Sequence, residues 1–136
     1  MSELNQQDRL DLTRMTMNLL GEWGVSDADQ VLLLGMPKGT RARHMSRYGE
    51  EQAFPAEYDI FVRVEHFIGI ADALRTSFPR NAHMGKFWIN QRNKRFGNRT
   101  SLNFMLEDGL NAIVAVRVHL DCAYDWQVDE SKVGKI

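Results

Sequence analysis

The chain contains one cysteine, Cys122, and only 3 prolines in 136 residues. A single cysteine excludes an internal disulfide and a cysteine-rich zinc site, and it is typical of a reducing compartment. No run approaches the ~18 consecutive apolar residues that a membrane span needs. The first residues, MSELNQQDRLDL, are acidic and polar, whereas a signal peptide is basic and then apolar. We therefore expect a cytoplasmic protein without a membrane partner.

Little in the sequence is typical of catalysis or metal binding. His119 and Cys122 are the residue types of a nucleophilic pair, but no second base, oxyanion loop or glycine-rich phosphate cradle accompanies them. The other histidines, His44, His66 and His83, are too scattered to predict metal ligands. The sequence predicts a protein that is not an enzyme and that needs no cofactor.

The charge of the chain is nearly balanced but unevenly distributed. The net charge is -1, yet the stretches 38–47 and 80–99 carry cations and no acid, while acids gather between them and near the C-terminus. Each stretch predicts a cationic surface, which serves either as a binding face or simply as a solvated one. The cations are Lys38, Arg41, Arg43 and Arg47 in the first stretch, and Arg80, Lys86, Arg92, Lys94, Arg95 and Arg99 in the second.

The spacing of apolar residues predicts an all-α chain. It favours an amphipathic helix over 8–23, a short helix between a cap at Ser26 and a stop at Gly35, and a long core helix over 58–78. Pro79 breaks this pattern and predicts a boundary between domains 1–79 and 80–136. Beyond it we expect a helix over 81–90, a polar loop over 91–100, and a helix capped by Thr100 or Ser101.

Residues 113–120 are ambiguous. Valines and Leu120 alternate with other residues there, which is the pattern of a strand. A single strand would have no partner in a helical chain, so we predict a helix.

The segment 26–47 has the arrangement of a helix-turn-helix. A short helix is followed by the turn residues Pro37 and Gly39, and Thr40 is placed to cap a short basic helix. The second helix of this motif enters the major groove of DNA. Two short helices joined by glycine also occur in plain helical bundles, so DNA binding and mere packing remain alternatives. The predicted DNA-contacting residues are Lys38, Thr40, Arg41, Arg43, His44 and Arg47.

The segment 87–120 carries a more specific pattern. Its residues, in order, are Phe87, Trp88, Ile89, Asn90, Asn93, Phe96, Gly97, Ser101, Leu102, Met105, Leu106, Gly109 and Ile113. This order resembles the toxin-binding domain of Xre/MbcA/ParS-type antitoxins, a small helical unit that in the family follows an Xre-like helix-turn-helix. The chain departs from the family in having Thr100 and Ser101 where a proline is common, and a single glycine, Gly97, where the family has a pair.

The resemblance implies an antitoxin of a type II toxin–antitoxin pair. Such proteins form homodimers, bind the operator DNA of their own operon, and occupy a cognate toxin, often a RES-type enzyme that consumes NAD. Aromatic and cationic side chains are enriched at protein interfaces, and Trp126 in the acidic C-terminal part is a candidate anchor. The expected toxin-binding residues are Trp88, Arg92, Lys94, Arg95, Arg99, Tyr124 and Trp126.

Two other functions remain open on the sequence. One is a helical interaction protein that does not bind DNA, which the six acids between Glu50 and Asp72 favour. The other is a free-standing transcription regulator with a small-molecule pocket under Trp88.

Overall fold

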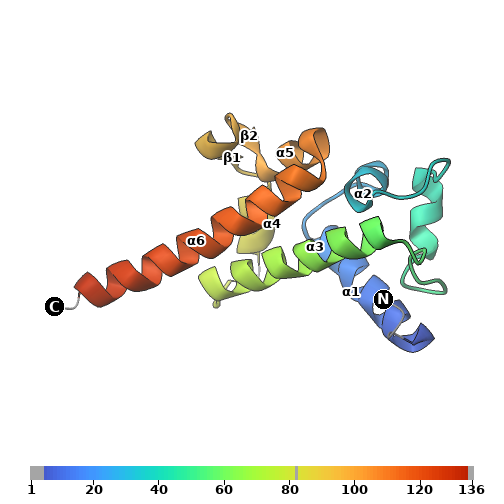
Figure 1. Cartoon of the computed structure of the whole chain (residues 1–136), viewed down its shortest axis with the longest axis horizontal. Coiled ribbons are helices and arrows are strands. Elements are labelled where there is room, and N and C mark those ends of the chain that lie inside the picture. Colours follow the sequence, from blue (N-terminus) through green and yellow to red (C-terminus); the bar gives the residue numbers. More distant parts are fainter. Residues whose placement is uncertain (1–4, 82, 135–136) are drawn as a thin grey trace.

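The computed structural model describes residues 5–81 and 83–134, and their side chains up to Cys122. Within these ranges the chain is helical apart from one two-stranded hairpin, which confirms the predicted all-α fold (Figure 1). The α-helices are α1 (Gln6–Glu22), α2 (Asp27–Leu34), α3 (Tyr58–Ser77), α4 (Met84–Ile89), α5 (Ser101–Asp108) and α6 (Leu110–Gly134). The 3₁₀ helices are η1 (Ala42–Arg47) and η2 (Lys94–Phe96), and the strands are β1 (Arg92–Asn93) and β2 (Arg99–Thr100).

Helix α3 is the centre of the molecule. Its apolar positions recur at helical spacing, and Phe67 and Ile70 are fully buried. Helix α6 packs along α3, and its C-terminal end extends away from the rest of the chain (Figure 1). The two helices approach closely at Gly69, where an added Cβ would lie 2.3 Å from Nε of Arg117. A residue larger than glycine there would displace the Arg117 side chain.

One hydrophobic core runs across the predicted boundary at Pro79. The buried cluster includes Leu34 and Phe67 on one side of Pro79, and Met105 and Ile113 on the other. Helices α2 and α5 are also in contact. The elements before and after Pro79 therefore support each other's positions.

Helix α1 packs through a face that hydropathy alone does not identify. Thr13 and Thr16 are buried, whereas Met15 is 53% exposed. Each threonine hydroxyl donates a hydrogen bond to a backbone carbonyl four residues earlier, which satisfies its polar group within the helix. Thr13 also accepts a hydrogen bond from the backbone N–H of Phe54 at 2.9 Å.

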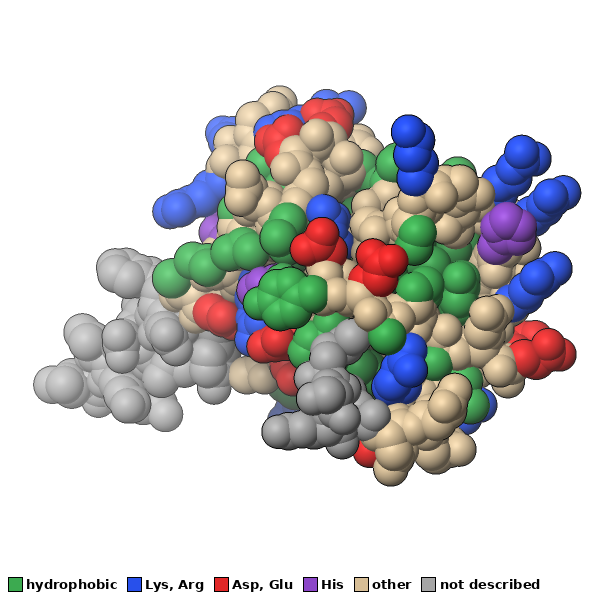
Figure 2. Space-filling view, turned by 45° about the vertical axis from the view of Figure 1, so that its right-hand side comes forward, with side chains coloured by type: hydrophobic (Ala, Val, Ile, Leu, Met, Phe, Trp, Pro, Cys, Tyr) green, Lys and Arg blue, Asp and Glu red, His purple; other side chains and the backbone are tan. Residues whose placement is uncertain are grey.

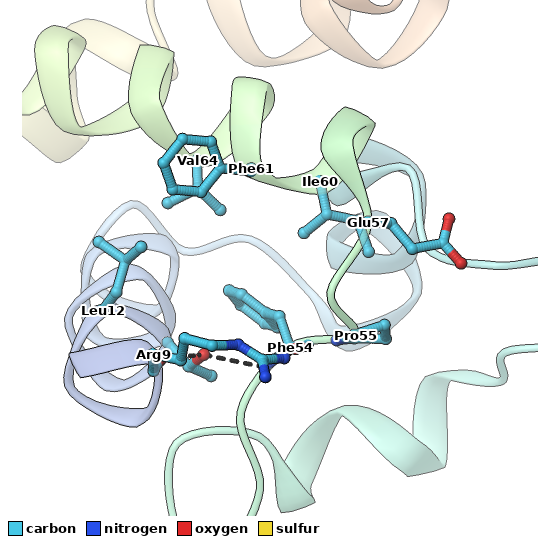
Figure 3. A pocket seen from close by; sticks show the side chains of 9 residues that line it. Arg9, Leu12, Phe54, Pro55, Glu57, Ile60, Phe61 and Val64 are labelled. Atoms are coloured by element: carbon cyan, nitrogen blue, oxygen red, sulfur yellow. Dashed lines mark hydrogen bonds between the residues drawn. The ribbon is translucent and has the colours of Figure 1, made fainter. Parts of the chain in front are cut away.

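This contact fixes the segment that follows η1. Arg9 donates to the carbonyl of Phe54 at 2.9 Å, so both backbone polar groups of Phe54 are satisfied by side chains of α1 (Figure 3). Arg14 donates to the carbonyl of Gly49, and the φ of +90° at Gly49 allows the backbones to approach. The cavity bounded by Arg9, Phe54 and α3 has a volume of about 30 Å³. That volume is far below the ~300 Å³ of a small-molecule site.

Most predicted helix boundaries are confirmed. Ser26 caps α2 by accepting from the backbone N–H of Asp29, and Gly35 ends it in the left-handed conformation. Thr100 caps α5. Residues 113–120 are helical, because Ile113, Val116 and Leu120 form the buried face of α6.

Three predictions need correction. The helix predicted over 81–90 is the shorter α4, which begins at Met84. The stretch 91–100, which was predicted to be a loop, contains a β-hairpin. Its strands are two residues long, which is too short for an alternation of apolar and polar residues to be recognised in the sequence. Thr40 does not cap the basic helix: Arg41 is its N-cap residue, and the helix is 3₁₀ and not α.

Candidate DNA and protein interfaces

The predicted DNA-contacting residues form one basic edge around η1. Arg41, Arg43 and Arg47 are exposed, as is Lys38 in the preceding turn, and Thr40 and His44 are half-buried. Figure 2 shows cationic side chains and a histidine projecting from the side of the molecule where Figure 1 draws η1. Among the described residues, these cations have no carboxylate partner within 4.0 Å. We call this set, Lys38, Thr40, Arg41, Arg43, His44 and Arg47, the η1 edge.

Local contacts explain the shape of η1. Met45 is its buried residue and anchors the short helix to the core. His44 turns its Nδ1 back to accept a hydrogen bond from the backbone N–H of Arg41 at 3.1 Å. Six residues in 3₁₀ geometry rise about 2 Å each, so η1 spans roughly 12 Å.

The second basic stretch is built into the β1–β2 hairpin. Arg92 pairs with Thr100, and Asn93 pairs with Arg99. The side chain of Asn93 accepts from the backbone N–H of Arg95 at 2.9 Å and starts η2. The turn is closed by Gly97 and Asn98, both at positive φ. Glycine and asparagine are the residues that adopt this conformation most readily, so the sequence NKRFGN encodes the turn.

An aromatic layer holds the hairpin on α6. Phe96 is 5% exposed and stacks on Phe104 with ring centroids 4.7 Å apart. The ring of His119 lies edge-on to Phe96 at 5.5 Å and stacks with Trp88 at 6.2 Å. Burial, followed by the positive charge of Arg95, lowers the pKa of His119 below its usual value. His119 is therefore a packing residue whose charged form is disfavoured.

Trp88 thus lies inside this layer. It is half-buried, and the ring of His119 packs parallel to it, with Phe96 next along. A groove of about 480 Å³ lies beside Trp23, between α1 and α3.

Arg99 differs from the other hairpin cations. Its guanidinium donates to Glu107 at 2.7 Å and to Asp108 at 3.3 Å, and its Nε donates to the carbonyl of Phe96. The same group lies 4.8 Å from the centre of the Phe104 ring. Hydrogen bonds to the two carboxylates raise the pKa of Arg99. Arg99 therefore ties the hairpin to the end of α5.

The remaining cations face solvent. Arg92, Lys94 and Arg95 are exposed, and none of them forms an ion pair with a side chain in the described part of the chain. We call these three residues the hairpin cations. The predicted partner-binding residues Tyr124 and Trp126 lie outside the described side chains.

Sequence reasoning missed one exposed aromatic residue. Phe87 on α4 is 58% exposed, while its neighbours in the motif, Ile89 and Phe96, are buried. The exposure of Phe87 could have been predicted from a helical wheel, because Gly85, Trp88 and Ile89 share one face of the helix and Phe87 lies on the opposite face.

The described residues lack a metal-binding cluster and a membrane-spanning helix. They contain no group of three histidine, cysteine or acidic side chains that could hold a metal ion. No helix among them is both long and apolar enough to cross a membrane. Cys122 is exposed on α6.

No family model, curated protein or solved structure matches the chain. Its function is therefore argued from its own residues and their geometry.

Proposed function

We propose that the chain is an antitoxin. In this proposal its C-terminal part occupies a partner toxin, a RES-type NAD-consuming enzyme, and its η1 edge binds the operator DNA of their operon. The chain performs no chemistry: it neutralises the toxin by covering the active-site cleft with apolar and basic groups.

The observation that carries the proposal is the burial and backbone conformation of the residues in the antitoxin-like pattern. Ile89, Leu102, Met105 and Ile113 are buried, and Gly97 adopts positive φ where the hairpin turns. The pattern that resembles the antitoxin domain therefore corresponds to one compact unit of helix, hairpin and two helices. Four apolar members of the pattern lie in the core of this unit, whereas Phe87 is 58% exposed.

The hairpin cations give this unit a face for a protein partner. They project from a support fixed by the aromatic layer and by Arg99, so little backbone freedom of the loop is lost on binding. Cations without an ion-pair partner among the described residues favour an acidic surface on the partner and increase the rate of encounter with it.

The DNA-binding part of the proposal rests on the η1 edge. Its exposed guanidinium groups are free of ion pairs within the described residues, so they are available to phosphates and base edges. Arg41 and Arg43 are the residues we expect to make these contacts. A homodimer would present two such edges to the two halves of a palindromic operator.

The proposal is tested by purifying the tagged chain from its native host. The eluate is examined by mass spectrometry for bound protein and by footprinting for bound DNA. We expect a small NAD-consuming protein at a fixed ratio, together with protection of DNA upstream of the gene. Recovery of the chain without either partner would overturn the proposal.

A second candidate function is favoured by the short η1. A six-residue 3₁₀ helix is a small element with which to read a major groove. In this second candidate, the helix-turn-helix arrangement serves packing only, and the chain is an interaction protein that binds no DNA. A toxin in the eluate without any DNA footprint would favour it.

A further inference from the structure

Helix α4 presents opposite faces to the core and to solvent. Ile89 is fully buried, and an added Cβ at Gly85 would lie 3.7 Å from the indole nitrogen of Trp23. Trp88 turns toward His119 on the same side. Because successive residues are 100° apart on a helix, His83 and Phe87 fall on the outward face.

The position of α4 is fixed by its C-terminal end. Asn90 donates from Nδ2 to the carbonyl of Trp23 at 3.0 Å and to that of Lys86 at 2.8 Å. The Lys86 side chain lies across Gly24, where an added Cβ would be 3.3 Å from its Cε. Phe87 is therefore presented on a helix that is clamped to the end of α1.

Phe87 borders a shallow hollow. The hollow has a volume of about 620 Å³ and is lined almost entirely by apolar atoms of His83, Met84, Lys86, Phe87, Asn90 and Gln91. Of the other exposed apolar residues, Met15 borders the groove between α1 and α3, whereas Leu32 and Tyr58 border none of the hollows described here. Scattered single apolar residues are ordinary on a surface, but an aromatic ring beside an apolar hollow is the usual form of an interface anchor.

The charge around the hollow restricts its occupant. The stretch 80–99 contains six cations and no acid. Lys86 lines the hollow itself, and β1 with Arg92 begins directly after Gln91. A partner that covers Phe87 must therefore bring negative charge to the rim.

We propose that the Phe87 face of α4 is the apolar anchor of the interface with the partner toxin. The partner places an apolar side chain in the hollow and surrounds it with aspartate or glutamate. This inference rests on the proposed antitoxin function and deepens it. It gives Phe87 an anchoring role like the one that the sequence predicted for Trp126, whose side chain lies outside the described ones.

The test uses the full-length chain and the purified product of the gene that adjoins its own, made inactive by substitution. Binding is measured by titration calorimetry for the wild type, Phe87→Ala, Phe87→Glu and Tyr58→Glu. Tyr58 is a matched control because it is a 75% exposed aromatic residue at the N-terminal end of α3, whereas α4 follows the C-terminal end of that helix. Circular dichroism and thermal melts check that every variant folds, as expected for exposed positions.

We expect Phe87→Ala to raise the dissociation constant by about 30-fold or more, as at other anchor residues, and Phe87→Glu to raise it further. Tyr58→Glu should leave it unchanged. The wild-type complex should weaken as salt rises from about 50 to about 300 mM, because the rim pairs are charged.

The outcomes separate the two proposals. A wild-type chain that does not bind the neighbouring gene product overturns the antitoxin function and this inference with it. Tight binding that Phe87→Glu leaves intact overturns only the inference. Tight binding that is lost in Phe87→Glu but insensitive to salt overturns the acidic rim.

Discussion

The two cationic surfaces of this chain are built in different ways. The η1 edge is a short 3₁₀ helix anchored by Met45, with its neighbouring segment held by side chains of α1. The hairpin cations stand on a closed turn that is fixed by the aromatic layer and by the Arg99 contacts. Both surfaces nevertheless depend on one core that continues across Pro79.

The comparison distinguishes cations that support the fold from cations that are available to a partner. At the hairpin, Arg99 is committed to Glu107 and Asp108 and leaves only Arg92, Lys94 and Arg95 for a partner. At η1, the exposed cations make no such internal pairs among the described residues. A cation in a sequence therefore predicts a contact only after its internal partners are known.

The first prediction tests the shared core through its two anchors. Replacing Phe96 by Ala should cost about 3–5 kcal/mol of unfolding free energy, and replacing Met45 by Ala about 2–5 kcal/mol. Because one core links them, each variant should unfold in a single transition at lower denaturant, followed by tryptophan fluorescence and by circular dichroism. Two separated transitions would show that the halves fold independently.

The second prediction tests the η1 edge. Arg41→Ala and Arg43→Ala should each weaken operator binding roughly tenfold and reduce the slope of log K against log salt by about 1. Arg75→Ala is the control, because Arg75 is an exposed cation on α3 that pairs with Asp72. Electrophoretic mobility shifts at several salt concentrations measure both quantities. Equal effects of all three variants would remove the assignment to η1.

The third prediction compares Thr40, which precedes η1, with Thr100, which precedes α5. Thr100→Ala should cost about 1 kcal/mol, because Thr100 accepts from the backbone N–H of Asn103 at 3.0 Å. Thr40→Ala should change stability by less than about 0.5 kcal/mol, because Arg41 and not Thr40 is the N-cap residue of η1. Urea unfolding of both variants measures the difference. A larger loss at Thr40 would mean that η1 starts earlier than its N-cap indicates.

The fourth and smallest effect concerns His119. Its lowered pKa means that the unfolded chain takes up a proton at higher pH than the folded chain does. Stability should therefore fall as the pH drops through about 6.5, the ordinary value for histidine, toward the lower folded pKa. His119→Gln should remove this part of the pH dependence. Melting temperatures of both proteins between about pH 5 and pH 8 provide the check, and parallel curves would contradict it.

Much of the fold could be predicted because it is encoded locally. Ser26, Gly35 and Thr100 perform the capping roles that their residue types predict. The long helix α3 follows from apolar spacing alone. The alternation of valines over 113–120 did not produce a strand, because burial of Val116 and Leu120 against α3 and α5 follows the helical period.

The rest depends on contacts between distant residues. Burial of Thr13 is explained by the backbone of Phe54, 41 positions away. The position of the Trp88 ring depends on His119, which lies on a different helix, α6. Likewise, the commitment of Arg99 to Glu107 becomes visible only when the hairpin and α5 are side by side.

The most direct test of the account exchanges one charge on each surface. Arg43→Glu and Arg95→Glu are each assayed against DNA from upstream of the gene and against the inactivated product of the neighbouring gene. The account predicts a crossed result: Arg43→Glu loses DNA and keeps the protein partner, while Arg95→Glu loses the protein partner and keeps DNA. Two variants that lose the same partner, or that lose neither, would contradict two separate surfaces with two separate functions.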